Sequence, residues 1–248
     1  MSDITSVNTV APITNVAICL KALEVIMERE EHLPGMAGFY GPAGFGKSMA
    51  AAYAANQHRA YYIQCKSTWS KSSLVKALLR EMGIKPKGTI TDMVEQACEE
   101  LIHSNRPIII DEVDHVVHKK AVEIIRDIYE GSEAPILLIG EEQLSSELEK
   151  WERFHSRILE WSAAQPVCLD DARMMRRLYS HDVDIEDDLL NHLIDLSDGS
   201  VRRVCVNISK IHKFAREEGL KSIDLNGWDN RPLYRGRPIK RDLRRGLR

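Results

Sequence analysis

The stretch "GFYGPAGFGKSMAAAYA", residues 38–54, decides which fold the chain can adopt. Residues 41–48 within it match the pattern G-x-x-x-x-G-K-[ST] at every fixed position. Glycines in this pattern let the backbone wrap closely around phosphate oxygens and point its N–H groups at them. A short apolar run precedes the loop and an Ala-rich, helix-favouring run follows it. The stretch therefore predicts a strand, a phosphate-binding loop and a helix in succession.

The residues of this loop have distinct expected roles. Lys47 would neutralise the β- and γ-phosphates of a nucleotide. Ser48, which opens the helix, would offer its hydroxyl to Mg²⁺, and the helix N-terminus would favour negative charge. The predicted nucleotide-binding residues are Gly41, Pro42, Ala43, Gly44, Phe45, Gly46, Lys47, Ser48 and Met49.

A second motif, "PIIIDEVD", places two carboxylates at the end of a buried strand. In proteins with this phosphate loop, an aspartate such as Asp111 orients Mg²⁺ and its water ligands. A glutamate that follows it, here Glu112, can polarise an attacking water. The pair favours hydrolysis of ATP over simple storage of a nucleotide.

Strand and helix signals alternate through the first two thirds of the chain. This spacing predicts an α/β fold with a parallel sheet covered by helices on both faces. A helical stretch with several basic residues is expected after residue 140. Strands are expected at 35–41, 60–65, 107–112, 135–140 and 166–170, and helices at 15–30, 48–57, 70–83, 89–105 and 119–131.

The strand signal stops near residue 170, and the next fifty residues read as three helices. The sequence thus predicts a small all-α subdomain attached to the α/β core. The expected divisions are a lead-in at 1–14, a nucleotide-binding core at 15–169, a helical lid at 170–220 and a basic tail at 221–248.

The charge of the chain is unevenly distributed. The net charge is −3, yet residues 231–248 contain eight Arg or Lys and one Asp, so the preceding residues carry −10. Such a tail suits contact with a polyanion or a partner protein, or it is a solvated end. The five cysteines are widely spaced and mostly lie in apolar runs, which favours reduced thiols in a cytoplasmic protein. Neither a signal peptide nor a membrane span is expected.

The order of these parts resembles that of the AAA+ ATPases over residues 15–220. More narrowly, "AYYIQCKSTWSK", "IIIDEVDHVV", "ILLIGEEQL", "WERFHSRILEW" and "GSVRRVCVNI" look like MuB-type transposition proteins of Mu-like phages, which include the TnsC-like regulators. The resemblance implies a homo-oligomer, in the form of a helical filament or ring, on double-stranded DNA in a bacterial host. It implies ATP and Mg²⁺ as cofactors and a transposase as partner.

The same resemblance suggests roles for four arginines. Arg157 matches the segment where AAA+ proteins place the arginine finger, which completes the ATP site of a neighbouring subunit, and Arg153 is the second candidate. Arg202 falls where the lid's sensor arginine normally lies, with Arg203 as its alternative. The fourth strand departs from the family pattern because Gly140 and Glu141 stand where a small polar residue is common.

The resemblance also places DNA-binding loops after the second strand and after the Asp-Glu strand. These loops carry the lysines that we expect to contact DNA phosphates, Lys66, Lys71, Lys119 and Lys120. The basic tail would add DNA contacts or engage the transposase.

Three functional hypotheses follow. The first is a DNA-binding AAA+ ATPase that forms filaments on double-stranded DNA, delivers target DNA to a transposase and activates it. The second is an AAA+ ATPase of another class, either secretion-associated and ExeA-like or a replication initiator or loader. The third is a scaffold that binds ATP but hardly turns it over.

Overall fold

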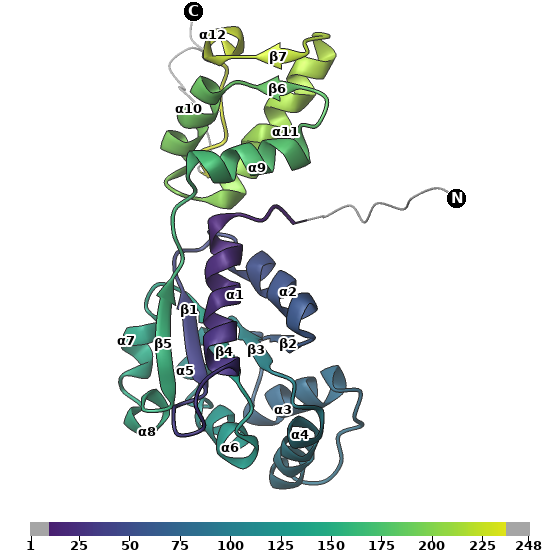
Figure 1. Cartoon of the computed structure of the whole chain (residues 1–248), viewed down its shortest axis with the longest axis vertical. Helices are drawn as coiled ribbons and strands as arrows, with labels where there is room; N and C mark the ends of the chain where they lie inside the picture. Colours follow the sequence, from purple (N-terminus) through teal and green to yellow (C-terminus); the bar gives the residue numbers. More distant parts are fainter. Residues whose placement is uncertain (1–9, 237–248) are drawn as a thin grey trace, which may run out of the picture. The chain divides into compact units, whose positions relative to one another are not determined.

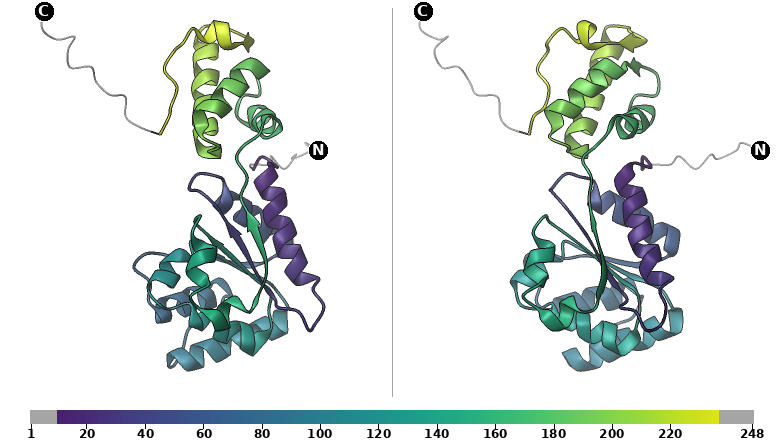
Figure 2. Two further views of the ribbon diagram at one scale, coloured as in Figure 1. Left: turned by 90° about the vertical axis from the view of Figure 1, so that its left-hand side faces the viewer. Right: turned by 60° about the vertical axis from the view of Figure 1, so that its left-hand side comes forward.

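The computed structural model describes residues 10–236, and the contacts within them divide the chain into two units. The first unit spans Pro12–Gln165, and the second contains the residues that follow Gln165. No helix among the described residues is long and apolar enough to cross a membrane. Figures 1 and 2 show an α/β architecture in the first unit and a mainly helical one in the second.

A five-stranded parallel sheet forms the centre of the first unit, with the strand order β2-β3-β4-β1-β5. The three central strands are almost continuously apolar and buried, as expected where helices cover both faces of a parallel sheet. The strands are β1 (Met36–Tyr40), β2 (Tyr61–Gln64), β3 (Ile108–Asp111), β4 (Ile136–Gly140) and β5 (Ile158–Ala163).

Helices cover both faces of this sheet. α1 and α2 contact one face, whereas α3, α4, α6 and α7 pack into the core on the other. In Figure 2 the purple α1 lies on the opposite side of the sheet from the green-teal helices. The helices of this unit are α1 (Thr14–Met27), α2 (Lys47–His58), α3 (Lys71–Glu81), α4 (Ile90–Ser104), α5 (Asp114–His118), α6 (Glu123–Ser132), α7 (Leu144–Leu148) and α8 (Glu152–His155).

The last strand of the sheet is not where the sequence predicts it. The expected strand at 166–170 is wrong, because β5 lies earlier, within the stretch expected to be helical. β5 is an edge strand whose residues are half-buried, so it lacks the apolar run that reveals the central strands. In the predicted segment, the backbone N–H of Cys168 donates instead to the carboxylate of Asp171, and this contact caps the next helix.

One predicted helix begins later than expected, and a short helix precedes it. The helix predicted at 119–131 is α6, which begins only at Glu123, and α5, which ends at His118, is not predicted by the sequence. Lys120 between them has a φ of 54°, a left-handed conformation that interrupts the helical path. The remaining strands and helices predicted for the core are confirmed within a few residues at each end.

The second unit has the three predicted helices, α9 (Leu169–Tyr179), α10 (Asp187–Ser197) and α11 (Val201–Glu217), packed on one another. It also contains β6 (Asp184–Ile185) paired in parallel with β7 (Ser222–Ile223), followed by α12 (Leu225–Trp228). The Trp228 ring is buried and meets Phe214 edge-on at 5.4 Å. Asn207 holds the following segment, because its side chain bonds both the N–H and the carbonyl of Tyr234.

The segment expected as a basic tail from residue 221 is therefore structured in its first part. β7, α12 and residues 229–236 belong to the helical unit. Residues 237–248 of that expected tail, and residues 1–9 of the expected lead-in, lie outside the described residues.

Candidate nucleotide-binding site

The predicted phosphate loop connects β1 to α2, as its sequence requires. Gly41 has a φ of 155°, and a Cβ added there would lie 2.8 Å from the Cβ of Ala164. Gly46, with a φ of 84°, is the left-handed residue from which α2 begins. A side chain is disfavoured at both positions, which accounts for the two fixed glycines of the motif. The loop thus leads into the N-terminus of α2 at the carboxyl edge of the sheet.

Lys47 lies folded against the phosphate loop. Its Nζ donates to the carbonyl oxygens of Gly41 and Pro42 at 2.5 and 2.9 Å. Burial lowers the pKa of Lys47, and the nearby carboxylates of Glu141 and Asp111 act in the opposite direction. The ammonium group is therefore close to the carboxyl ends of β3 and β4 and can exchange its two carbonyl contacts for phosphate oxygens.

Asp111 is held in one orientation at the end of β3. Asp111 is only 2% exposed, and its two carboxylate oxygens accept hydrogen bonds from different donors. The backbone N–H of Glu112 donates to Oδ1 at 2.8 Å, and the Tyr62 hydroxyl donates to Oδ2 at 2.9 Å. Burial and the charge of Asp111 raise the pKa of Tyr62, so its hydroxyl remains a donor across the ordinary pH range.

Glu112 extends from the same strand end into a more open environment. Its backbone has a φ of 53°, a left-handed conformation that is uncommon for residues other than glycine. Its Oε1 accepts a bond from Gln64 Nε2 at 3.1 Å, and its Oε2 lies 3.8 Å from His115 Nε2. Neither Gln64 nor Tyr62 was expected from the sequence, although strand register pairs Gln64 with Asp111.

The oxygen donors at this place suit Mg²⁺. Ser48 is exposed at the start of α2, and Asp111 supplies a buried carboxylate. Mg²⁺ in proteins commonly takes one or two such ligands and completes its shell with phosphate oxygens and water. Within residues 10–236 there is no group of three or more His, Cys, Asp or Glu side chains arranged to hold a metal. The donor set therefore fits a magnesium ion carried by a nucleotide.

Two buried thiols interact electrostatically with Asp111 and are not reactive. All five cysteines are free, and Cys19 and Cys65 are fully buried. Burial, reinforced by the charge of Asp111, raises the pKa of each of these two thiols to about 12. Both remain protonated at neutral pH, which makes nucleophilic chemistry at these positions unfavourable.

Asn15 was not identified from the sequence, yet it holds the phosphate loop in place. It is only 2% exposed on α1, and its Nδ2 donates to the carbonyl oxygens of Phe45 and Gln165, both at 2.8 Å. Its Oδ1 accepts from the backbone N–H of Gln165 at 2.7 Å. One side chain thus joins the loop to the end of the first unit across separations of 30 and 150 residues.

Replacing Asn15 with Ala is expected to lower the free energy of unfolding by about 1–3 kcal/mol, because the Phe45 carbonyl then loses its partner in a buried place. Urea titration followed by circular dichroism measures this change. Asn56→Ala, at an exposed position of the neighbouring helix α2, serves as the matched control and is expected to be neutral. Equal stability of the two variants would show that the Asn15 bonds contribute little.

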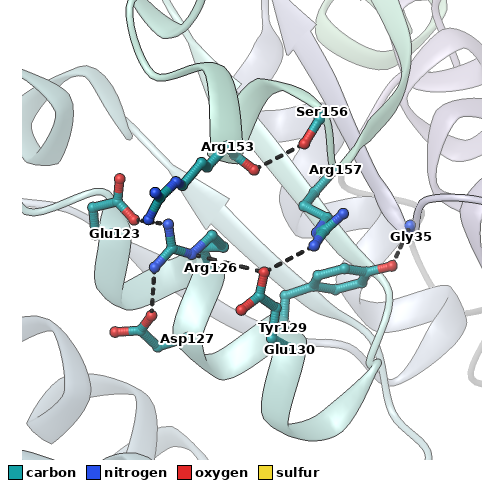
Figure 3. A network of polar contacts seen from close by, with 9 residues as sticks. All are labelled: Gly35, Glu123, Arg126, Asp127, Tyr129, Glu130, Arg153, Ser156 and Arg157. Atoms are coloured by element: carbon teal, nitrogen blue, oxygen red, sulfur yellow. Dashed lines mark hydrogen bonds and ion pairs between the residues drawn. The ribbon is translucent and has the colours of Figure 1, made fainter.

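The arginines Arg153 and Arg157 come from the segment before β5 and lie beside residues of α6 (Figure 3). The Arg157 guanidinium donates to Glu130 Oε1 at 3.1 Å, and its side chain is 43% exposed. Arg153 is exposed on α8, and its backbone carbonyl accepts from Ser156 Oγ. Arg126 on α6 shares Glu130 with Arg157 but also pairs with two further carboxylates, so Arg157 is the freer of these two guanidinium groups.

Arg157 stands at the opposite end of the sheet from the phosphate loop. Its carbonyl accepts from the N–H of Met36, the first residue of β1, whereas the loop follows the last residue of β1. Five strand residues separate the two ends, a distance of ~16 Å at ~3.3 Å per residue. Arg157 therefore cannot reach the phosphate loop of its own chain.

The two arginines expected to sense the nucleotide differ in their surroundings. Arg203 on α11 donates to the Ser197 carbonyl at 3.2 Å and pairs with Asp198. Arg202 is exposed. Of this pair, Arg202 has the side chain that is free to contact a ligand.

The four lysines expected to bind DNA come from two loops that meet. Lys119 Nζ donates to the Trp69 carbonyl at 3.0 Å, which joins the loop after β2 to the end of α5. Lys66 and Lys71 are exposed on either side of Trp69 in the sequence. Lys120, which is also exposed, follows Lys119. The structure therefore brings the two predicted loops together.

Comparisons with known proteins agree with this geometry. Residues 31–148 match a family model described as an AAA domain, whereas no curated protein sequence matches the chain. Among solved structures, the ORC2 protein of Aeropyrum pernix in ADPNP–ADP complexes is similar, with a TM-score of 0.65 and 17% identity over 84% of this chain. The RuvB branch migration motor of Thermotoga maritima gives a TM-score of 0.57 and 20% identity over 86% of this chain.

A third similar structure is the Aeropyrum pernix ORC1 protein in complex with DNA, with a TM-score of 0.59 and 14% identity over 86% of this chain. The present chain covers 64%, 65% and 62% of the ORC2, RuvB and ORC1 chains, less than two thirds of each. Identities at this level establish the fold alone. The parallel sheet, its flanking helices and the phosphate loop between β1 and α2 thus match the fold of a P-loop AAA+ NTPase, and residues 31–148 are the segment that matches the AAA domain model.

Proposed function

We propose that this chain binds and hydrolyses MgATP, and that ATP drives its assembly on double-stranded DNA. We infer hydrolysis from the pair of carboxylates at the end of β3. Asp111 is fixed by two donors, and Glu112 is held beside it by Gln64 in a position open to water. Bound ATP and Mg²⁺ supply the phosphoryl chemistry, while Lys47 neutralises phosphate charge and Glu112 takes a proton from the attacking water.

The ATP site is proposed to be shared between two copies of the chain. Arg157 lies ~16 Å from its own phosphate loop along β1, so it can act only on the nucleotide of another copy. A heterologous contact of this kind repeats from copy to copy and generates rings or helical filaments. Arg202 is the proposed sensor of the γ-phosphate, since Arg203 is committed to Asp198.

DNA binding is proposed for the joined loops that carry Lys66, Lys71, Lys119 and Lys120. Ammonium groups and a helix start suit phosphate oxygens, and they read no base sequence. A few such contacts per copy, repeated along an assembly, give strong and salt-sensitive binding. The resemblance to MuB- and TnsC-like proteins supports delivery of the bound DNA to a transposase and activation of that enzyme.

Co-sedimentation and electron microscopy with plasmid DNA, with and without ATP, test this proposal. We expect ATP-dependent assemblies on DNA of arbitrary sequence, and none with Lys47→Ala. Absence of DNA binding in every nucleotide state would contradict it. ATP turnover measured on the same samples separates an enzyme from a scaffold that only binds ATP.

Neutralising the joined loops is expected to weaken DNA binding without affecting the nucleotide site. A Lys66→Gln/Lys119→Gln variant removes two phosphate contacts, so the slope of log K against log salt should become shallower by about 1.8. Fluorescence anisotropy with labelled duplex at several salt concentrations measures this slope. Lys85→Gln, exposed elsewhere on the chain, should leave the slope unchanged. A parallel loss in the control would show that charge alone, and not these loops, determines binding.

Gln64→Ala is expected to alter the control of hydrolysis. The variant frees the Glu112 carboxylate from its amide partner, so basal ATP turnover should change by about three- to tenfold and depend less on DNA. ATP affinity should stay constant, because Gln64 contacts Glu112 and not the phosphate loop. Steady-state turnover with and without DNA measures both quantities, and Gln57→Ala is an exposed control. Unchanged turnover in both conditions would rule out a role for the Gln64 contact.

A replication initiator or loader is the second candidate function. The similarity to the ORC2 and ORC1 structures favours it, since these share the fold over most of this chain. Binding to one duplex sequence in preference to others would support this candidate. Sequence-tolerant assembly and stimulation of a transposase would support the first.

A further inference from the structure

The helices α4 and α6 lie side by side on the outside of the first unit (Figure 1). Residues from both helices line an open groove. It has a volume of about 710 Å³. Both helices lead directly into strands, so the groove runs alongside the strand direction from the carboxyl edge of the sheet to its amino edge. It is lined by Lys71, Ile90, Thr91, Val94, Glu95, Cys98, Glu99, Ile102, Ile124, Asp127 and Gly131.

The floor of the groove is apolar, and much of it is open to solvent. Ile90, Val94, Cys98 and Ile102 recur every four residues, which places them along one stripe of α4. Ile90 is 40% exposed and Ile102 is 62% exposed. Exposed apolar side chains arranged in a line within a groove are typical of a surface that binds a partner helix.

The rim of the groove is mainly acidic, although Lys71 also lines it. Glu95, Glu99 and Asp127 are exposed around the buried Cys98. Burial of Cys98, followed by the charges of these three carboxylates, raises the pKa of its thiol. A cationic segment with an apolar stripe would complement both the floor and the rim.

The chain itself contains one segment of this chemistry. Residues 237–248, "RPIKRDLRRGLR", carry six Arg or Lys and one Asp. The apolar residues Ile239, Leu243 and Leu247 recur every four residues, like those of α4. The stripe of α4 between Ile90 and Ile102 is ~18 Å long, which leaves room for three apolar side chains at this spacing.

We propose that the α4–α6 groove binds residues 237–248 of a second copy of the chain. Ile239, Leu243 and Leu247 occupy the apolar floor, and the flanking Arg and Lys side chains pair with Glu95, Glu99 and Asp127. This contact is separate from the nucleotide site and needs neither ATP nor DNA. It gives the basic tail a protein partner and ties neighbouring copies together.

A labelled peptide of residues 237–248 tests the contact by fluorescence anisotropy, without nucleotide or DNA. The receptor is the full chain carrying Ile239→Asn, Leu243→Asn and Leu247→Asn, so that its own tail does not compete. We expect saturable binding. A control peptide with the same three substitutions keeps every charge and should bind roughly tenfold more weakly. Equal binding of both peptides would reduce the interaction to charge alone and overturn the proposal.

Substitutions in the groove locate the contact. Ile102→Asn, at an exposed position that does not threaten folding, should weaken peptide binding by roughly tenfold. Val206→Asn, an exposed apolar residue of the helical unit, is the matched control and should have no effect. An unchanged affinity for Ile102→Asn would place the peptide elsewhere and overturn the proposal.

Sedimentation velocity of the full chain then tests whether the tail binds the groove of a second copy or the groove of its own chain. The unmodified chain should self-associate with rising concentration, and the tail variant and Ile102→Asn should each need roughly tenfold more protein to do so. Equal self-association of all three would mean that the tail does not link copies. Because neither nucleotide nor DNA is present, these results stand apart from the test of the function proposed above.

Discussion

Glu112→Gln is expected to lower ATP turnover by about 10²–10⁴-fold while ATP still binds, since an amide cannot take the proton of the attacking water. The substituted side chain keeps its shape, and the Gln64 amide can turn to accept or donate. The left-handed backbone at Glu112 is equally suited to glutamine. Phosphate release measures turnover, and a fluorescent ATP analogue measures binding. Assemblies on DNA should last longer, because the ATP proposed to drive assembly is no longer hydrolysed.

Glu142→Gln is the matched control for this prediction. Glu142 is exposed just beyond the end of β4, and its charge also acts on Lys47. It should retain near-normal turnover. Ordinary turnover in Glu112→Gln, or an equal loss in both variants, would reject Glu112 as the group that polarises water.

Arg157→Ala is expected to lower turnover in assemblies by about 10³–10⁵-fold, the range found for arginines that stabilise a transferring phosphoryl group. Its single-copy stability should change little, since the exposed pair with Glu130 contributes about 0–1 kcal/mol. Turnover and thermal unfolding measured on one preparation separate the two effects.

Arg153→Ala is the control, and it tests the second candidate for the same role. Arg153 is exposed on the neighbouring helix α8, and we expect at most a small loss. A larger loss for Arg153→Ala than for Arg157→Ala would exchange the roles of the two residues. Arg157→Lys should recover little activity, because an ammonium group does not match the planar geometry of the guanidinium.

The parts of the fold that the sequence predicts are those with strong local signals. The central strands β1, β3 and β4 are apolar on both faces, and the phosphate loop has fixed glycines, so periodicity and motif suffice for them. Periodicity does not reveal β5, because an edge strand is half-buried and its polar residues resemble those of a surface helix. β7 and α12 are too short to produce a periodic pattern.

In the site, too, the sequence predicts residues that form a short motif but not the partners that they contact from distant parts of the chain. Asp111 and Glu112 are adjacent in a recognisable motif, whereas their partners Tyr62 and Gln64 lie about fifty residues earlier. Asn15 bonds residues 30 and 150 positions away. Strand pairing and helix packing create these contacts, and no short-range pattern records them. The resemblance to AAA+ proteins pointed to Arg157, but its distance from its own phosphate loop follows only from the strand register.

The central claim is that each ATP site is completed by Arg157 of another copy. Mixing the Arg157→Ala and Glu112→Gln proteins in equal amounts on DNA, and measuring ATP turnover, tests it most directly. Each variant alone should be nearly inactive. In the mixture, roughly a quarter of the contacts join an intact Glu112 to an intact Arg157, so turnover should rise to a comparable share of the unmodified protein's rate. Turnover that stays at the level of the separate variants would contradict a shared site.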